Sequence, residues 1–146
     1  MMKLDDILGF KIYRAFSLLK NRIFHNFYKN EIAVNFEQWI ILNRLWDYDE
    51  QSQGDLLNLT TQSKGNFTRT LRKMEQENLI IKKKNLKDNR SSIISLTPNS
   101  QQLKTPLRSI AFKELSIAID GIDKADILIA EKVLTKIAEN LQRGES

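Results

Sequence analysis

The chain has 146 residues with a net charge of +5, and its five Gly and two Pro favour a mostly helical fold of one domain. The absence of cysteine excludes disulfides, thiolate metal sites, cysteine nucleophiles and direct thiol redox sensing. The only histidine, His25, is expected to be a partly exposed helix residue, and a single histidine argues against a histidine-rich metal site or a Ser-His-Asp triad. No apolar run reaches the roughly 20 residues of a membrane span and the N-terminus lacks the apolar stretch of a signal peptide, so a cytoplasmic location is expected.

The first part of the chain predicts two amphipathic helices. Apolar residues recur at steps of three and four over about residues 5–29, which is the spacing of one long helix. A second helix is expected to begin after Asn35, because Asn35 followed by Gln38 has the form of a capping box, and to end near Trp46. The apolar residues of this helix that we expect to be buried are Phe36, Trp39, Ile40 and Leu42.

Two shorter helices follow, separated by a turn of a few residues. Ser52, with Asp55 three residues later, predicts the cap of a short helix. Ser63 predicts the cap of the next helix, over residues 63–77, whose apolar residues at positions i, i+4 and i+7 lie on one face. These apolar residues are Phe67, Leu71 and Met74. Two short helices joined in this way have helix-turn-helix spacing.

The segment after residue 77 predicts a hairpin. Asn78 suits the left-handed conformation that ends many helices, because asparagine adopts it more readily than most residues that carry a side chain. Isoleucine-rich runs at 79–84 and 92–96 predict two strands, and the residues between them predict a polar, basic loop.

The last third of the chain predicts two more helices. Thr97 followed by Pro98 predicts a helix start, and this helix is expected to run to about residue 120 with a kink at Pro106. Asp123, with a second aspartate three residues later, predicts the cap of the final helix. The predicted fold class is therefore mainly α (α+β), with two strands between the fourth and the fifth of six helices.

Positive charge is concentrated in one block of the sequence. Residues 63–90 contain nine basic and three acidic groups, a net charge of +6. The remaining residues contain 14 basic and 15 acidic groups, a net charge of −1. Positive charge concentrated in one segment is stronger evidence for nucleic-acid binding than a positive net charge of the whole chain.

Helix 63–77 has the position of the recognition helix in a helix-turn-helix unit. Its first turns carry Lys64, Gly65, Asn66 and Arg69. Lysine and arginine can bind guanine, asparagine can pair with adenine, and glycine lets the backbone approach the DNA closely. The alternative is a charged, solvent-exposed helix face without a partner, and on this helix alone the two interpretations have equal weight.

The basic loop favours the DNA-binding interpretation. Lys87 and Arg90 lie at its tip, where an arginine can enter a narrow minor groove. Asp88 is expected to hold the Arg90 guanidinium in a bidentate ion pair, although it would alternatively do no more than favour the turn. The lysines at 82–84 would contact phosphates or, alternatively, keep the strand edge from pairing with other chains.

Five short runs occur in a definite order and spacing between residues 36 and 97 of the single chain 1–146. They are Phe36-Glu37-Gln38-Trp39-x-x-Leu42, Thr68-Arg69-Thr70-Leu71-x-x-Met74-Glu75, Asn78-Leu79-Ile80, Asp88-x-Arg90 and Ser95-Leu96-Thr97. Together they resemble the MarR family of winged helix-turn-helix transcriptional regulators. The sequence departs from the family where Asn78 replaces the usual glycine, where Asn89 replaces the first of two arginines, and where the glycine usual after Leu-Thr is missing.

The resemblance implies a homodimeric DNA-binding regulator, which we expect to be a repressor of a pseudo-palindromic operator. It implies a winged helix-turn-helix core at 32–97, with helix 63–77 in the major groove and wing 84–91 in the minor groove. The helical dimerisation region would comprise 1–31 and 98–146. The residues expected to face DNA are Ser63, Lys64, Gly65, Asn66, Thr68, Arg69 and Lys73 on the helix, and Lys84, Lys87, Asp88 and Arg90 on the wing.

The terminal helices are more apolar than a core of this size requires, which favours burial against a second copy of the chain. The alternative is a monomer with every helix packed inward. Many family members bind small aromatic anions between the dimerisation helices and the DNA-binding core, and no other cofactor and no metal is expected. The residues that would line such an effector site here, or alternatively belong to the core, are Tyr13, Arg14, Phe16, Phe36, Trp39 and Trp46.

The sequence leaves two hypotheses of function from different classes. The first is a dimeric, sequence-specific DNA-binding regulator. The second is a winged-helix module that binds protein without specific DNA binding, against which the concentration of charge argues. An enzyme is not expected, because the carboxylates are scattered and neither a glycine-rich phosphate loop nor a nucleophile–base pair is evident.

Overall fold

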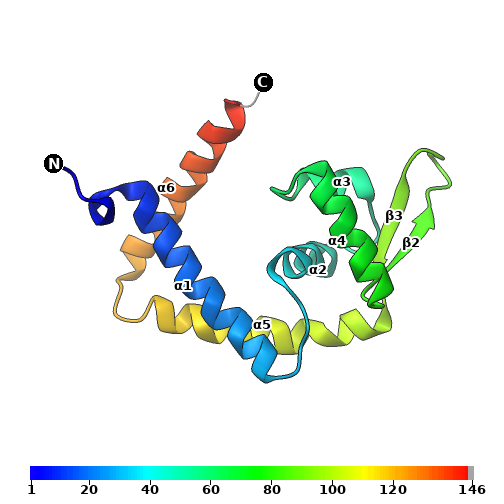
Figure 1. Cartoon of the computed structure of the whole chain (residues 1–146), viewed down its shortest axis with the longest axis horizontal. Coiled ribbons are helices and arrows are strands. Elements are labelled where there is room, and N and C mark those ends of the chain that lie inside the picture. Colours follow the sequence, from blue (N-terminus) through cyan, green and yellow to red (C-terminus); the bar gives the residue numbers. More distant parts are fainter. Residues whose placement is uncertain (145–146) are drawn as a thin grey trace.

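Helices dominate the computed structural model, which describes residues 1–144 (Figure 1). The chain runs from a 3-10 turn (Leu4–Asp6) through α1 (Leu8–Lys29), α2 (Phe36–Asp47), β1 (Gln51–Ser52), α3 (Gln53–Asn58) and α4 (Lys64–Gln76) to β2 (Ile80–Lys84), β3 (Ser92–Leu96), α5 (Pro98–Ala118) and α6 (Lys124–Arg143). The predicted order of helices and the two predicted strands are confirmed.

The sheet is small and antiparallel, with strand order β1-β3-β2. Ile80 of β2 lies opposite Leu96 of β3, and Lys84 lies opposite Ser92, so β2 and β3 form a hairpin that carries the basic loop at its end. Strand β1 pairs with the other edge of β3 and was not predicted, because two residues are too short to show an alternating pattern.

Local capping signals are confirmed at most of the predicted helix ends. Asn35 and Gln38 form a reciprocal capping box, in which the Asn35 side chain accepts from the Gln38 amide at 2.9 Å. Ser52 and Ser63 each accept from the backbone amide three residues later. Thr97 caps α5 in the same way. These bonds are formed within one turn of helix, so the sequence is sufficient to predict them.

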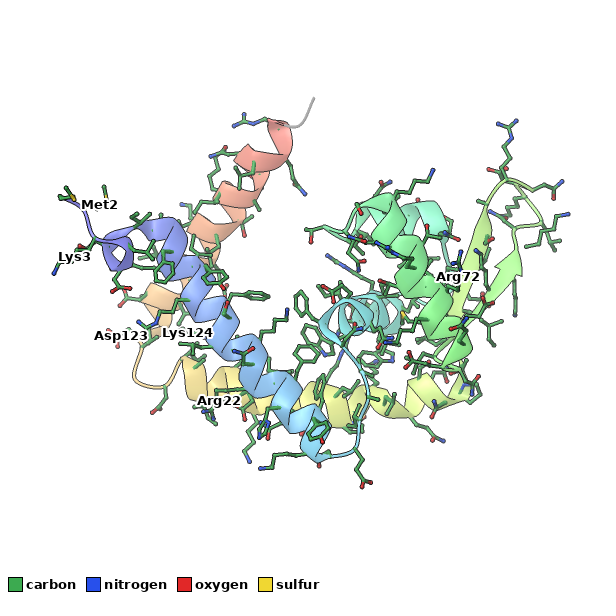
Figure 2. All side chains as sticks on the ribbon, in the orientation of Figure 1. Met2, Lys3, Arg22, Arg72, Asp123 and Lys124 are labelled. Carbon is green, nitrogen blue, oxygen red and sulfur yellow. The ribbon has the colours of Figure 1, made fainter. Side chains whose placement is uncertain are left out.

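One predicted cap lacks its hydrogen bond, and one predicted helix start is displaced. Asp123 occupies the N-cap position of α6 but makes no capping hydrogen bond with its side chain. This end of α6 is exposed, so water can satisfy its free amide groups (Asp123 and Lys124 are labelled in Figure 2). The first helix begins at Leu8 rather than near residue 5, because the Leu4–Asp6 turn and an extended Ile7 precede it.

One apolar core holds the winged part of the molecule together. It runs from Ile23 in α1 to Leu107 in α5, and so crosses both predicted domain limits, at 31 and at 98. Of the α2 residues predicted to be buried, Leu42 is buried, but Phe36, Trp39 and Ile40 are only half-buried. The other buried residues of α2 are Gln38, Ile41, Leu45 and Trp46. Phe36 and Trp39 pack against Phe24 of α1, and Trp39 and Phe24 also pack against the edge of the core.

Helix α6 takes no part in this core. It extends from the end of α5, at the opposite end of that helix from the β2–β3 hairpin (Figure 1). It buries no residue, although its apolar residues include Leu128, Ile129, Val133, Leu134 and Leu141. The alternative of a monomer with every helix packed inward is therefore wrong.

Asn78 connects α4 to β2 in a left-handed conformation, with a φ of 59°. We expect Asn78→Val to lower the free energy of unfolding by about 1–2 kcal/mol, because a β-branched residue is strained in this region, and Asn78→Gly to leave it unchanged or higher. Chemical denaturation of both variants measures the difference. Equal stabilities of the two variants would contradict the strain at this position.

Candidate nucleic-acid interface

Helix α4 is fixed in one rotation about its axis by its apolar face. Phe67, Leu71 and Met74 are at most 3% exposed, and the Ser63 hydroxyl accepts from the Asn66 amide at the start of the helix. The polar face therefore points outward. Of the predicted residues of this helix, Ser63, Lys64, Gly65, Asn66, Arg69 and Lys73 are exposed and Thr68 is half-buried.

Several polar side chains of α4 are already engaged with one another. The Arg69 guanidinium donates to Asn66 Oδ1, so these two side chains form a pair. The Thr68 hydroxyl donates to the Lys64 carbonyl at 2.9 Å. Sequence reasoning treated each of these residues as independent, and the i, i+3 spacing of Asn66 and Arg69 was the signal that would have joined them.

The tip of the β2–β3 hairpin is organised by turns. Asp88 Oδ1 accepts from the backbone N–H of Arg90 at 3.0 Å, and Asn85 Oδ1 accepts from the backbone N–H of Lys87 at 3.0 Å. The predicted ion pair between Asp88 and the Arg90 guanidinium is wrong; the Asp88 carboxylate favours the turn instead, by accepting from the backbone two residues later. The side chains of Lys84, Lys87, Asp88 and Arg90 are all exposed.

A groove of about 350 Å³ joins α4 to this hairpin. Three cationic residues line it: Lys64 from α4, Lys82 from β2 and Arg90 from the hairpin tip. The structure thus brings three predicted residues together, Lys64 and Thr68 from α4 and Arg90 from the hairpin tip, although Lys64 and Arg90 are 26 positions apart in the sequence. Lys73 lies elsewhere, at the other end of α4, 4.0 Å from the Glu77 carboxylate.

Sequence reasoning missed the contribution of α3 to this groove. Gln53 and Gly54, at the start of α3, line it beside Lys64. No local signal marked them, because their position follows from the packing of α3 against β3 rather than from their own residue types. Arg72, labelled on α4 in Figure 2, adds a further exposed cation to that helix.

The residues predicted to line an effector site are not all brought together. Phe16, Phe36 and Trp39 form one aromatic cluster, with ring centroids 5.3 Å apart for Phe16 and Phe36 and 6.2 Å apart for Phe36 and Trp39. Trp46 lies in the core, where Nε1 donates to the Ser100 carbonyl at 3.1 Å. Of the other two residues, Tyr13 is exposed and Arg14 lines a separate groove beside Phe10.

Residues 1–144 contain neither a metal-binding cluster nor a membrane-spanning helix. No group of three or more His, Cys, Asp or Glu residues is placed to hold a metal ion. No helix in this range has the length and apolar character needed to cross a membrane.

The fold is shared with solved MarR-type regulators. A MarR transcriptional regulator from Methanosarcina mazei Go1 superposes with a TM-score of 0.80 and 21% identity, covering 93% of this chain and 96% of that one. The transcriptional repressor CouR, bound to a 23-mer DNA duplex, superposes with a TM-score of 0.82 and 18% identity, covering 94% of this chain and 99% of that one.

Sequence comparison establishes the family. A family model described as "Transcriptional regulator SarA/Rot" matches residues 23–107, the span between the first and last residues of the apolar core. The organic hydroperoxide resistance transcriptional regulator of Bacillus subtilis (strain 168) is 31% identical over 109 residues, which are 70% of this chain and 69% of that protein. The chain is a MarR-family transcriptional regulator. Within this family it matches the SarA/Rot description through its winged-helix part.

In this MarR-family chain, Arg90→Ala tests the hairpin tip. We expect about tenfold weaker binding to duplexes with A/T-rich flanks, about 1.4 kcal/mol, because arginine favours the deep negative potential of a narrow minor groove. Fluorescence anisotropy with A/T-rich and G/C-rich flanks measures the effect. Lys124→Ala removes the same charge at the exposed start of α6 and is the control. Unchanged affinity in a folded Arg90→Ala protein would refute the assignment of the tip.

Proposed function

We propose that the chain is a dimeric, sequence-specific DNA-binding repressor that recognises a pseudo-palindromic operator and responds to a small aromatic or anionic effector. In the proposed complex, helix 63–77 lies in the major groove and wing 84–91 in the adjacent minor groove. The cationic groove between α4 and the hairpin carries this proposal, because it joins an exposed helix face to a basic hairpin on one surface.

The residues of α4 would divide into two roles. Lys64, Asn66 and Arg69 would read bases, and the hydrogen bond between Arg69 and Asn66 supports treating these two as one unit. Because of that bond, Arg69 and adenine would share Asn66 Oδ1 as an acceptor if Asn66 paired with adenine. The residues that would support the approach to the DNA backbone are Ser63, Gly65, Thr68 and Lys73.

The backbone of the wing would be preorganised for DNA binding. The Asp88 turn fixes the main chain at Arg90, while the Arg90 guanidinium has no hydrogen bond or ion pair to any other residue in the range 1–144. A free guanidinium on a defined turn suits insertion into a minor groove. Lys84 and Lys87 would contribute phosphate contacts.

A second copy of the chain is the proposed partner of α6. This helix has 20 residues and buries none of them, while its apolar side chains face solvent. Two copies related by a two-fold axis would cover this surface and place two α4 helices on successive turns of DNA. The 1–31 and 98–146 segments would supply the dimer contacts.

The effector is proposed from the aromatic cluster between α1 and α2. Lys20 lies 4.8 Å from the centroid of the Phe36 ring, and Trp39 Nε1 is buried without a hydrogen-bond partner among the described residues. A cation, aromatic rings and a free donor together suit an aromatic anion. Among similar structures, Bordetella bronchiseptica BpsR has its DNA binding regulated by 6-hydroxynicotinic acid.

Direct peroxide sensing through a thiol is not proposed. The relative from Bacillus subtilis is an organic hydroperoxide resistance regulator. This chain contains no cysteine, so it has no thiolate that a hydroperoxide could oxidise to a sulfenic acid.

Selection of bound genomic fragments, followed by anisotropy at several salt concentrations, tests the proposed function. We expect one enriched pseudo-palindrome, and an affinity loss of about 10³-fold or more between about 50 and about 200 mM salt, as neutralisation of six or more phosphates requires. A protein-binding module would show neither enrichment nor salt-sensitive retention of duplex DNA, and that result would reject the proposal.

Leu134→Glu tests the dimer. We expect a monomer by sedimentation and about 100-fold weaker binding to a two-half-site duplex, because a charge would replace an apolar contact between copies. Lys136→Glu makes a larger charge change on the polar side of the same helix and should remain dimeric. A dimeric Leu134→Glu protein would show that α6 is not the interface.

A further inference from the structure

Helix α5 belongs to two parts of the molecule at once (Figure 1). Its first half packs in the core through the buried side chains of Ser100 and Leu107. Its second half packs against α1, where buried Glu114 accepts hydrogen bonds from Arg22 Nε and Asn26 Nδ2, each at 2.6 Å. Ile110 and Ala111 still pack against the core, so the residues from Leu107 to Ala111 form the part of α5 that the winged-helix region and the α1–α5 pair share. This shared part is the junction between the two.

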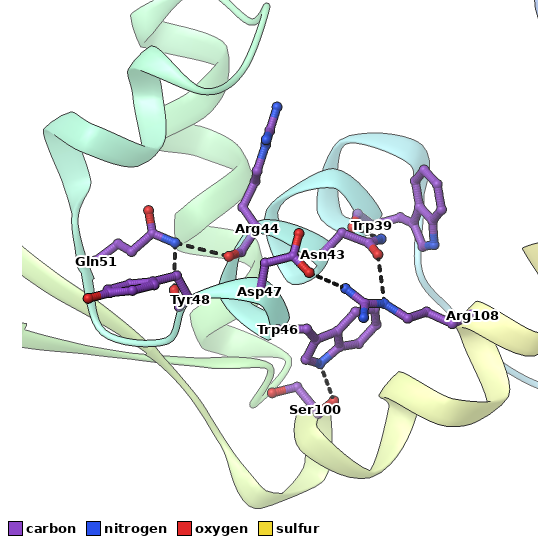
Figure 3. Close-up of polar contacts among 9 residues, drawn as sticks. All are labelled: Trp39, Asn43, Arg44, Trp46, Asp47, Tyr48, Gln51, Ser100 and Arg108. Atoms are coloured by element: carbon purple, nitrogen blue, oxygen red, sulfur yellow. Dashed lines mark hydrogen bonds and ion pairs between the residues drawn. The ribbon is translucent and has the colours of Figure 1, made fainter. Parts of the chain in front are cut away.

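Arg108 binds α2 at this junction (Figure 3). Its Nη2 donates to Asp47 Oδ1 at 2.7 Å, and its Nε donates to Asn43 Oδ1 at 3.2 Å. The guanidinium carbon also lies 5.5 Å from the centroid of the Trp46 ring. Three residues of one helix thus hold one planar group, which is a directional contact.

The groups that receive Arg108 are themselves held in place. Asn43 Nδ2 donates to the Trp39 carbonyl at 2.8 Å, which leaves Asn43 Oδ1 directed at Arg108. Trp46 Nε1 donates to the Ser100 carbonyl, so the ring is tied to α5 two turns before Arg108. The direction of the guanidinium is therefore determined by α2.

Pro106 lies inside α5, two residues before Arg108. Proline has no amide hydrogen, so the helix lacks one backbone hydrogen bond here, and the ring crowds the preceding turn. A helix weakened in this way bends more readily. The weak point lies just before the part of α5 that packs against both the core and α1.

We infer that Pro106 is a hinge and Arg108 is its lock. Arg108 is a positioning residue that fixes the angle between the winged-helix region and the dimerisation helices, and thereby the half-site spacing that the dimer accepts. The inference rests on the proposed function, because spacing has meaning only for a dimer with two DNA-reading helices.

The contact of Arg108 is suited to setting an angle rather than to stabilising the fold. The Arg108 and Asp47 side chains are 38% and 67% exposed, and ion pairs so exposed contribute little to folding. The apolar contact of neighbouring Leu107 is non-directional and would tolerate a rotation that the guanidinium fork resists. A small rotation at α5 becomes a displacement of α4, because α4 lies on the far side of α2.

Spacing selectivity tests the lock. Anisotropy is measured on duplexes that carry the two selected half-sites with the spacer native, one base pair longer or one base pair shorter. We expect wild type to favour one spacing by about tenfold, Arg108→Ala to favour it by about twofold, and the thermal unfolding midpoint to change little. Lys104→Ala removes one exposed charge from the same helix and should keep the wild-type preference.

Two further variants sharpen the comparison. Arg108→Lys keeps the positive charge and the aliphatic part of the side chain but lacks the planar guanidinium, so its spacing preference should resemble that of Arg108→Ala. If Arg108→Ala folds poorly, Arg108→Lys is the variant that tests the lock. Pro106→Ala restores the backbone amide, so the Pro106→Ala/Arg108→Ala double variant should recover part of the lost preference.

The outcomes separate this inference from the proposed function. A wild-type protein that binds no two-half-site duplex would reject both. A wild-type protein with a preferred spacing, beside folded Arg108→Ala and Arg108→Lys dimers with the same preference, would overturn the lock and leave the repressor proposal standing. A uniform loss of affinity at every spacing would also overturn it, because that pattern indicates a direct DNA contact.

Discussion

The packing of α4 onto the core through Phe67, Leu71 and Met74 is the constraint on which the rest of the interface depends. Each of these side chains is nearly fully buried, and turning the helix would return their surface to water at about 25 cal/mol per Å². With one face fixed, the opposite face must present its cations to solvent. The constraint extends to the hairpin, because only Glu77, Asn78 and Leu79 separate α4 from β2.

The features that could be predicted from the sequence are those that depend on residues close together along the chain. The caps at Asn35, Ser63 and Thr97 are hydrogen bonds between residues three apart, and the left-handed turn at Asn78 depends on one residue. The buried stripe of α4 follows from helical periodicity. These local signals were enough to give the order of the elements and a winged helix-turn-helix fold.

What could not be predicted depends on contacts between distant segments or on a choice between competing hydrogen bonds. Asp88 had two possible partners in Arg90, and the structure shows a hydrogen bond to its backbone amide, which the turn holds close, and none to its guanidinium. The core-facing side of α2 depends on where α1 and α4 lie, which no spacing within α2 shows. For the same reason Gln53 and Gly54 gave no sign of lining the cationic groove.

The proposed dimer, α6 and the Arg108 contact depend on one another in a definite order. A helix that buries no residue is marginal in water, so α6 would draw its stability from the second copy. The second half of α5, which Glu114 already holds to α1, would then also have a fixed direction relative to the second copy, and Arg108 would set the angle of the winged-helix region against it. An effector in the aromatic cluster between α1 and α2 would act on this same angle, because α1 is joined to α5 at Glu114 and α2 is joined to α5 at Arg108. The effector would lower DNA affinity by as much as it prefers one angle over the other.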